Sequence, residues 1–501
     1  GAERAAPEVD AREVLARTRG LGADAVLLTA STPSDGPVAL AAEAVRPRGR
    51  VVAIGAVGLN LPRRPFYFKE AELVVSKSYG PGRYDPEYEE RGRDYPPAYV
   101  RWTEQRNIQA ILDLMASGRL NVAALTTHRF PIEKAEDAYD LVKRAEARSL
   151  GILLEYPPGE ISPSVCLRTV PSDERPAAAF LGAGQFARAV LLPRLRELGS
   201  LRLKILCSPG SLSAADAAGK FGFEEVTTDE DYALGDPEVK VVFIATRHDQ
   251  HARLAARALK AGKHVFVEKP LAIRPEEIDL IEEALRSAPS PAPILMVGFN
   301  RRFSPAARAV REFFRDAAAP LTASVRFNAG PVPPGHWTQD PGVGGGRLVG
   351  EACHAIDLVS YLIGAPPVRV FAESIGGPAA PAVTEDQCFL TLRHADGSVS
   401  SVAYLAGGDR GLPKERVEVF GGGRAAVIDD FREVLFSSGG KLRRDRRWRQ
   451  DKGHRTEFEI FADVVRRGGD APIAWEELRA VSLASLLAVR SLREGVPFDV
   501  A

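Results

Sequence analysis

The stretch Ala178-Ala-Phe-Leu-Gly-Ala-Gly-Gln-Phe-Ala187 decides the fold of the larger part of this chain. Its first four residues are a short apolar run, which predicts a buried strand. Two glycines separated by one residue follow, and a helical pattern then continues to about Leu198. This order of strand, glycine turn and helix is typical of the first unit of a doubly wound α/β domain.

The turn has the spacing Gly182-x-Gly184-x-x-Ala187. In dinucleotide-binding proteins the first glycine makes the tight turn, and the second lets backbone amides approach a pyrophosphate. The helix N-terminus, here Gln185 and Phe186, favours the negative charge. A tight turn that binds nothing is the simpler interpretation, but the flanking strand and helix favour a dinucleotide site.

The second expected strand, residues 203–207, bears on the choice of nicotinamide cofactor. A carboxylate commonly follows this strand and holds the ribose 2′-hydroxyl of NAD. Here Ser208 follows, with neither a carboxylate nor an adjacent arginine for the 2′-phosphate of NADP. NAD and NADP therefore both stay open, with a mild preference for NADP.

Two further strand ends carry polar residues where ligands bind in open α/β sheets. Thr246-Arg247-His248 is expected to reach the nicotinamide half of the dinucleotide, whereas His251 is predicted to be a packed structural histidine. Glu268-Lys269-Pro270 follows the strand expected over residues 264–267. We predict that Glu268 and Lys269 contact a ligand and that Pro270 makes a cis bond feasible; the alternative is a surface turn.

A glycine-rich segment, residues 344–350, leads into a helix with Glu351, His354 and Asp357. Glycines let the chain come close to a ligand. The three-residue spacing places the polar side chains on one helical face, where carboxylates could orient the histidine and tune its pKa toward neutrality. An exposed, salt-bridged face is the alternative, but the flanking residues are strongly apolar.

The whole pattern predicts an α/β protein in several parts. Residues 1–156 suggest a truncated Rossmann-like segment with buried parallel strands at 25–28 and 50–55. Five prolines between positions 157 and 176 predict a linker. A complete Rossmann domain is expected over residues 177–297, and an α/β domain with a large open, mostly antiparallel sheet over residues 298–501.

These segments together resemble the Gfo/Idh/MocA family of oxidoreductases, over about residues 177–500. The resemblance rests on the glycine turn, Glu268-Lys269-Pro270, the Gly-Phe-Asn-Arg-Arg-Phe run at 298–303, and His354-x-x-Asp357. It implies a catalytic lysine at Lys269, a catalytic histidine at His354 and a substrate-binding acid at Asp357. It also implies a homo-oligomer formed through the open sheet.

The same resemblance implies a reaction. An NAD(P)-dependent enzyme of this kind transfers hydride between nicotinamide and a hydroxyl-bearing carbon of a sugar, nucleotide sugar or cyclitol. Two alternatives stay open: glycoside cleavage through a transient oxidation, and a non-catalytic ligand-sensing or scaffold protein. The chain departs from the family pattern at Gly350, where many members have an acid, and at Arg247-His248, where many have Pro-Asn.

The N-terminal part resembles something else. Residues 48–55 (Arg-Gly-Arg-Val-Val-Ala-Ile-Gly) and 127–131 (Thr-His-Arg-Phe-Pro) look like the second half of a zinc-type, medium-chain alcohol dehydrogenase, over about residues 11–156. The whole arrangement resembles bidomain oxidoreductases of polysaccharide biosynthesis, in which these two families are fused. The metal-binding half is missing here, so we expect no zinc. Because the chain starts at Gly1, we expect either absent upstream residues or a retained scaffold.

Weaker signals concern the substrate. Residues 441–452 hold seven lysines and arginines around Trp448, which indicates a solvated hairpin or a clamp for a phosphorylated or nucleotide-linked sugar. His336-Trp337 suggests either a wall for a sugar face or a core tryptophan. The candidate substrate contacts are Arg302, Trp337, Glu351, Lys452 and His454.

Composition bounds the remaining possibilities. Lys plus Arg equals Asp plus Glu at 66 each, so no net charge attracts nucleic acid or an anionic membrane. Four scattered cysteines form neither a CxxC motif nor a disulfide framework. The chain has no apolar run of the length that spans a membrane. A cytoplasmic protein with a small-molecule substrate is therefore expected.

Overall fold

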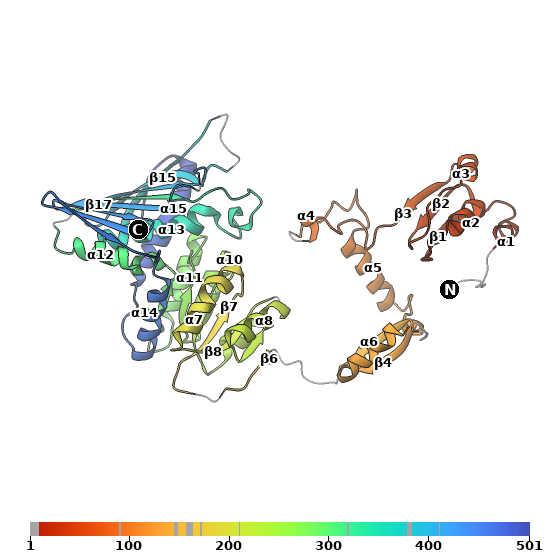
Figure 1. Cartoon of the computed structure of the whole chain (residues 1–501), viewed down its shortest axis with the longest axis horizontal. Helices are drawn as coiled ribbons and strands as arrows, with labels where there is room; N and C mark the ends of the chain where they lie inside the picture. The colour runs from red at the N-terminus through yellow and green to blue at the C-terminus, as the bar shows by residue number, and fades with distance from the viewer. Residues whose placement is uncertain are drawn as a thin grey trace. The chain divides into compact units, whose positions relative to one another are not determined.

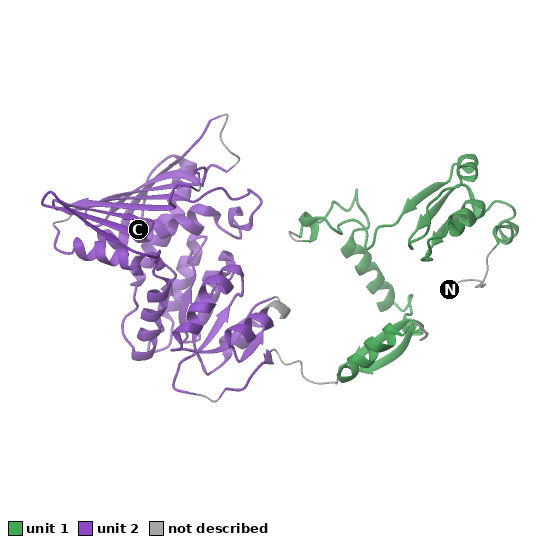
Figure 2. Cartoon of the chain, viewed as in Figure 1, with its two compact units in different colours: residues 1–159 green, residues 160–501 purple. Residues whose placement is uncertain are grey.

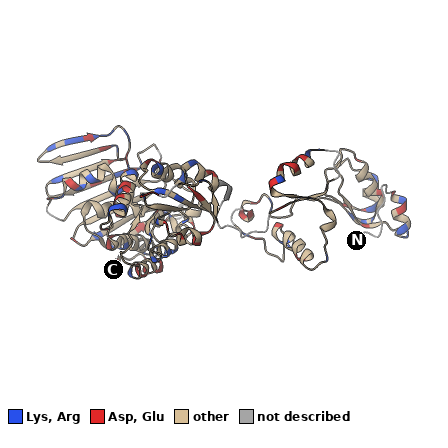
Figure 3. Ribbon diagram, turned by 90° about the horizontal axis from the view of Figure 1, so that it is seen from below, with Lys and Arg blue, Asp and Glu red and all other residues tan. Residues whose placement is uncertain are grey.

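The computed structural model describes residues 10–89, 92–144, 149–156, 164–170, 173–209, 211–317, 320–377, 383–409 and 411–500. The chain divides into two compact units, residues 1–159 and 160–501 (Figure 2). No helix among the described residues has the length and apolar character needed to cross a membrane. Lysines and arginines are interspersed with aspartates and glutamates in both units (Figure 3).

The first unit contains a small parallel sheet in the order β1-β2-β3 (Figure 1). Its strands are β1 (Ala23–Leu28), β2 (Val45–Ala53) and β3 (Glu72–Val75). A separate parallel pair joins β4 (Thr126–Pro131) to β5 (Gly151–Glu155). The helices of this unit are α1 (Ala11–Arg17), α2 (Gly36–Ala44), α3 (Arg63–Lys69), α4 (Pro86–Glu89), α5 (Glu104–Ala116), η1 (Ala123–Leu125), η2 (Ile132–Lys134) and α6 (Ala135–Lys143).

The prediction that the strands near residues 25 and 50 are parallel is confirmed. The prediction of burial holds for Val51 and Ala53 on β2, which are 0% and 3% exposed, but not for β1, where Leu27 is 61% exposed. The buried cluster of this sheet is small and consists of Leu28, Val38, Ala41, Val45 and Val51. Three strands with so few apolar partners leave much of the sheet surface uncovered.

The second unit begins with a seven-stranded sheet in the order β12-β11-β10-β7-β8-β9-β6. All neighbours are parallel except β6 and β9. Its strands are β6 (Ser164–Cys166), β7 (Ala177–Leu181), β8 (Arg202–Cys207), β9 (Glu225–Thr227), β10 (Val239–Ile244), β11 (His264–Val267) and β12 (Leu295–Val297). The helices are η3 (Ala187–Leu191), α7 (Leu192–Leu198), α8 (Ser211–Phe221), α9 (Glu230–Gly235), α10 (His248–Lys260) and α11 (Pro275–Arg286).

This sheet is the Rossmann domain that the glycine turn predicted. Every residue of β7 and β8 is buried, as expected for parallel strands covered on both faces. The strand order reverses at β7, which is where ligands bind in doubly wound sheets. Strand β6 lies within the stretch expected to be a linker, whose residues 157–163 and 171–172 lie outside the described ones.

A nine-stranded sheet follows, in the order β20-β19-β18-β17-β13-β16-β15-β14-β21. It is antiparallel except where β13 pairs with β16, which agrees with the predicted open, mostly antiparallel sheet. Its strands are β13 (Thr322–Asn328), β14 (Pro367–Ser374), β15 (Gln387–His394), β16 (Val399–Leu405), β17 (Glu415–Gly421), β18 (Arg424–Asp429), β19 (Glu433–Ser438), β20 (Lys441–Arg446) and β21 (Phe498–Asp499). Burial alternates along β15 and β16, so one face is covered and the other is open.

Helices of this second part pack on the covered face and on the Rossmann domain. They are η4 (Asn300–Phe303), α12 (Pro305–Phe313), η5 (Trp337–Gln339), η6 (Leu348–Ala352), α13 (Cys353–Ile363), α14 (His454–Arg467) and α15 (Trp475–Glu494). Helix α14 returns to the Rossmann domain, where the Phe458 ring lies 5.0 Å from that of Phe266 and 5.7 Å from that of Phe243. The two sheets therefore belong to one packed unit.

Candidate active site

The glycine turn after β7 is built to receive a ligand. Gly182 has φ +97°, and a Cβ added there would lie 2.5 Å from the carbonyl oxygen of Ala245. A side chain is thus excluded at this position. A Cβ added at Gly184 would meet nothing within 4 Å, so the space in front of this residue is free. Gln185 and Phe186 begin the helix, and the Phe186 side chain is 46% exposed.

The end of β8 provides no carboxylate. The Ser208 amide donates to the carbonyl oxygen of Thr227 at 3.0 Å, which ties this turn to β9. The preceding Cys207 is buried, and burial raises the pKa of its thiol to about 12. This edge of the sheet therefore carries small neutral side chains next to the glycine turn.

The end of β10 brings together residues that are distant in sequence. His248 begins α10, and its Nδ1 lies 2.7 Å from the carbonyl oxygen of Gly344. The ring of Trp337 packs edge-on against His248 at 4.8 Å, and the Arg247 guanidinium lies 5.6 Å from the Trp337 ring. The structure thus places Trp337 beside the predicted cofactor residues Arg247 and His248.

Two histidines of α10 are structural in character. Burial holds the pKa of His248 down, at about 3, so its ring is neutral at physiological pH. His251 is 1% exposed, and its Nδ1 lies 2.8 Å from the carbonyl oxygen of Pro270. The prediction of a packed structural histidine at position 251 is confirmed.

Lys269 lies where β11 ends, and the Lys269–Pro270 peptide is cis. The Lys269 ammonium donates to the carbonyl oxygen of Gly350 at 2.9 Å. Gly350 stands one helical turn before His354, so this bond brings the lysine to the helix that carries the histidine. A Cβ at Gly350 would lie 3.0 Å from the His248 ring, which explains why the family's acid has no room here.

His354 is 5% exposed, and its ring packs edge-on against Phe299 at 6.1 Å. Its Nδ1 is buried and has no hydrogen-bond partner among the described residues. Burial lowers the pKa of His354 well below its usual range, and the charges of Arg301 and Lys269 act in the same direction. A neutral ring with an unpartnered buried nitrogen is suited to exchange a proton with a ligand.

The predicted carboxylate–histidine–carboxylate ladder is wrong. Glu351 contacts Arg347 at 2.8 Å and both Tyr404 and Lys414 at 2.5 Å. These three partners therefore bind the carboxylate that was expected to orient His354. The expected tuning of the His354 pKa toward neutrality also fails, because burial lowers this pKa and the charges of Arg301 and Lys269 lower it further.

Asp357 is the residue that was predicted to bind substrate. It is 1% exposed and binds Arg302 through both carboxylate oxygens, at 2.5 to 3.1 Å. Arg302 in turn donates to Glu477 at 2.9 Å. Helical spacing correctly placed Asp357 on the buried side of α13, but buried carboxylates pair with the nearest cation, which here comes from η4.

The remaining candidate residues lie around η4 and the start of α14. Lys452 Nζ is 2.6 Å from Glu415, the same carboxylate that Arg301 binds at 2.7 Å. His454 Nδ1 lies 3.5 Å from the Asn300 amide nitrogen, and its ring is 6.4 Å from that of Phe186. His454 thus connects the glycine turn with the second part of the unit.

Several buried charges at this site escaped the sequence analysis. Arg301 was quoted only as part of a motif, and Glu415 and Glu457 were not singled out. Glu415 sits on β17, in an ordinary alternating strand pattern, so no local signal marked it. Its role as partner of Arg301 depends on tertiary packing alone.

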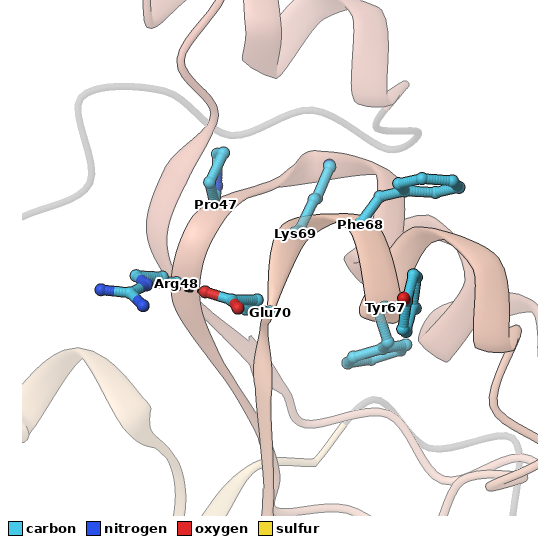
Figure 4. A pocket seen from close by; sticks show the side chains of 7 residues that line it. Pro47, Arg48, Tyr67, Phe68, Lys69 and Glu70 are labelled. Atoms are coloured by element: carbon cyan, nitrogen blue, oxygen red, sulfur yellow. Dashed lines mark hydrogen bonds and ion pairs between the residues drawn. The ribbon is translucent and has the colours of Figure 1, made fainter.

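A pocket in the first unit is lined by Pro47, Arg48 and residues 66–70, and none of these is a predicted site residue (Figure 4). Arg48 is ion-paired with Glu70 at 2.8 Å, and Tyr67 is 68% exposed. Among the described residues, no group of three His, Cys, Asp or Glu side chains is arranged to hold a metal ion.

Fold and site together define a nicotinamide-dependent oxidoreductase that acts on CH–OH groups. Residues 177–314 match the oxidoreductase family with an NAD-binding Rossmann fold, and residues 319–424 match the GFO/IDH/MocA C-terminal domain. Residues 177–314 and 319–424 therefore match the two domains that the Gfo/Idh/MocA family models describe.

Known relatives agree with this assignment. Levoglucosan dehydrogenase of Pseudarthrobacter phenanthrenivorans is 31% identical over 227 residues, which cover 40% of this chain and 57% of that protein. Inositol 2-dehydrogenase of Rhizobium meliloti is 28% identical over 335 residues, which cover 64% of this chain and 98% of that protein.

The fold has the same relatives. The solved structure of a levoglucosan dehydrogenase in complex with NADH and levoglucosan matches with a TM-score of 0.58 at 23% identity. The match covers 65% of this chain and 99% of that one.

Proposed function

We propose that the chain oxidises or reduces a hydroxyl-bearing carbon of a neutral sugar or cyclitol, with Lys269 and His354 as its catalytic residues. The observation that carries this proposal is the buried, unpartnered Nδ1 of His354 on the helix to which Lys269 is bonded through Gly350. The neutral His354 ring can exchange a proton with a substrate hydroxyl, and the positively charged Lys269 ammonium can stabilise the hydroxyl oxygen.

A bound nicotinamide supplies the hydride acceptor or donor at this site. The free space at Gly184, the helix start at Gln185 and Phe186, and the edge formed by Ser208, Thr246 and Arg247 fit such a cofactor. His354 takes the hydroxyl proton during oxidation and returns it during reduction. The Lys269 ammonium stabilises the developing alkoxide, and the Asp357–Arg302 pair holds the helix of His354 in place.

The cofactor site is tested with Gly184→Glu, because a carboxylate in this free space repels and displaces a pyrophosphate. We expect saturable quenching or enhancement of NADH or NADPH fluorescence with the unaltered chain. Affinity should be at least about a hundredfold weaker in the variant, which corresponds to about 2.7 kcal/mol. Gly219→Glu, at an open position on α8, is the matched control and should bind normally. Equal binding by Gly184→Glu would contradict the site.

The buried charges favour an uncharged substrate. Arg301 and Lys452 share Glu415, at 2.7 and 2.6 Å. The other pairs nearby are Arg302 with Asp357 and Glu477, and Arg347 and Lys414 with Glu351. A substrate phosphate would have to break one of these pairs to gain any of these cations, which is costly in a buried site. The cations of 441–446 lie on β20, the edge strand of the large sheet.

This leads to a prediction for substrate choice. Glucose and myo-inositol should be better substrates than glucose 6-phosphate and inositol 1-phosphate, by about tenfold or more in kcat/KM, or about 1.4 kcal/mol. The measurement is NAD(P)H formation with each matched pair. A preference for the phosphate esters would exclude the neutral substrate class.

We also propose that the chain forms a cytoplasmic homo-oligomer, which associates through the open face of the nine-stranded sheet. The first unit would then be a scaffold derived from a medium-chain dehydrogenase, in a fusion that serves polysaccharide biosynthesis. Exposed apolar side chains on that open face, among them Phe389 at 60% and Phe420 at 45% exposure, support the oligomer.

A further inference from the structure

Glu457 is a buried carboxyl group that the proposed reaction does not use. It stands in the first turn of α14 and is 1% exposed. Its Oε1 is buried and has no hydrogen-bond partner among the described residues. The start of the helix is tightly packed, because a Cβ on Gly453 would lie 2.3 Å from the carbonyl oxygen of Asn300. A charged side chain held in such a place needs an explanation.

The packing of α14 places Glu457 beside Glu268. Phe461, one turn after Glu457 and on the same helical face, packs against Phe266 with ring centroids 5.6 Å apart. Glu268 follows β11 directly and stands two residues after Phe266. The ladder of β11 continues to this residue, because the Glu268 amide donates to the carbonyl oxygen of Ile244. Side chains two apart on a strand share a face. Glu457 stands one helical turn before Phe461 on α14. It therefore lies toward the strand end that carries Glu268.

Glu268 is confined in its turn. It is 7% exposed, and a Cβ on Gly298 would lie 3.0 Å from its Oε1. A side chain at position 298 would therefore have to displace this carboxyl group. Among the described residues, no ion pair joins Glu268 or Glu457 to a lysine or arginine within 4.0 Å.

The cations nearby have other partners. Arg301 binds Glu415, Arg302 binds Asp357, and Lys269 donates to the Gly350 carbonyl. Two buried carboxyl groups without a cation of their own cannot both be ionised at little cost. Burial, followed by the charge of Glu268, raises the pKa of Glu457 well above its usual range, and burial raises that of Glu268 to about 7.

We infer that Glu457 is a positioning residue, protonated at neutral pH, which shares its proton with Glu268 and so keeps one negative charge beside Lys269. This inference rests on the proposed function, since it assigns the charge next to the proposed catalytic lysine. The shared proton lets Glu268 ionise without a second charge next to it. The charged groups that face Glu457 are Glu268, Asp357, Arg301 and Arg302. Those that face Glu268 include Lys269 and Arg301.

Infrared spectroscopy tests the proton without any turnover. At about pH 8, where exposed carboxyl groups are ionised, the unaltered chain should show a protonated carboxyl band. Glu457→Gln should remove this band, and Glu459→Gln, on the exposed side of the same helix, should leave it. In Glu268→Gln the band should disappear at a lower pH, because the neighbouring charge is gone. If the unaltered chain shows no such band, the inference is wrong.

The pH dependence of kcat/KM then tests the role. Activity should fall as the pH drops through the Glu268 pKa of about 7, because protonation removes the charge beside Lys269. In Glu457→Leu this fall should move to higher pH by about one unit, because no protonated carboxyl group then donates to the Glu268 carboxylate. Glu457→Gln keeps a donor and should leave the fall nearly in place. An unmoved fall in Glu457→Leu would make Glu457 merely structural. NADH binding, measured in the same variants, reports on the proposed function separately and should be unchanged.

Discussion

Replacing His354 with alanine is expected to slow turnover by about two to four powers of ten. The ring has a buried nitrogen without a partner and a pKa well below its usual range, so it is neutral and able to accept a proton. Alanine removes this acceptor and leaves the Lys269–Gly350 bond in place. The loss should therefore appear mainly in kcat, because the interaction is made in the transition state.

The measurement is steady-state NAD(P)H formation together with a fluorescence titration of the cofactor. NADH affinity should stay nearly intact, because the glycine turn follows β7 and is separate from α13. His128→Ala, in the first unit, is the control and should keep the full rate. Because the low pKa keeps the His354 ring neutral, its own titration should cause no loss of activity between about pH 6 and 8. A His354→Ala enzyme with an unchanged kcat would rule out the assignment.

The fold of the second unit could be predicted from sequence because its signals are local. The strand, glycine turn and helix at 178–198 and the buried runs of β8 and β10 each show their period within a few residues. The first unit shows the limit of this reasoning. The runs in β1 and β2 have the composition of buried strands, but their burial depends on neighbours that only the tertiary structure supplies, and Leu27 is exposed.

The residues of the candidate site also differ in how far the sequence predicts them. Lys269 and His354 could be proposed as catalytic residues because they stand at a strand end and a helix start with marked sequences. The partners of the buried charges could not be predicted, because an ion pair such as Arg301 with Glu415 joins residues 114 positions apart. Helical spacing showed that Glu351 and Asp357 face inward, but it contained no information on which cations would bind them.

Arg302→Met is expected to destabilise the second unit by about 3 to 5 kcal/mol. The substitution keeps much of the side-chain volume and leaves Asp357, which is 1% exposed, without its cation. Removing one partner of a buried pair leaves an uncompensated charge, which costs more than the pair contributes. Arg455→Met is the matched control, because Arg455 is 79% exposed in its pair with Glu459, so its loss should leave stability nearly unchanged.

The loss from Arg302→Met should grow with pH. Burial already raises the pKa of Asp357 to about 6, so its protonated form is favoured in the folded state and stability declines as pH rises through this value. Without Arg302 the pKa rises further, and the variant can avoid the buried charge at about pH 5 but not at about pH 8. Hydrogen exchange of α13 at both pH values measures this difference. A loss independent of pH would show that packing, rather than the charge of Asp357, is what Arg302 supports, and Arg302→Met/Asp357→Leu would then be no more stable than the single variant.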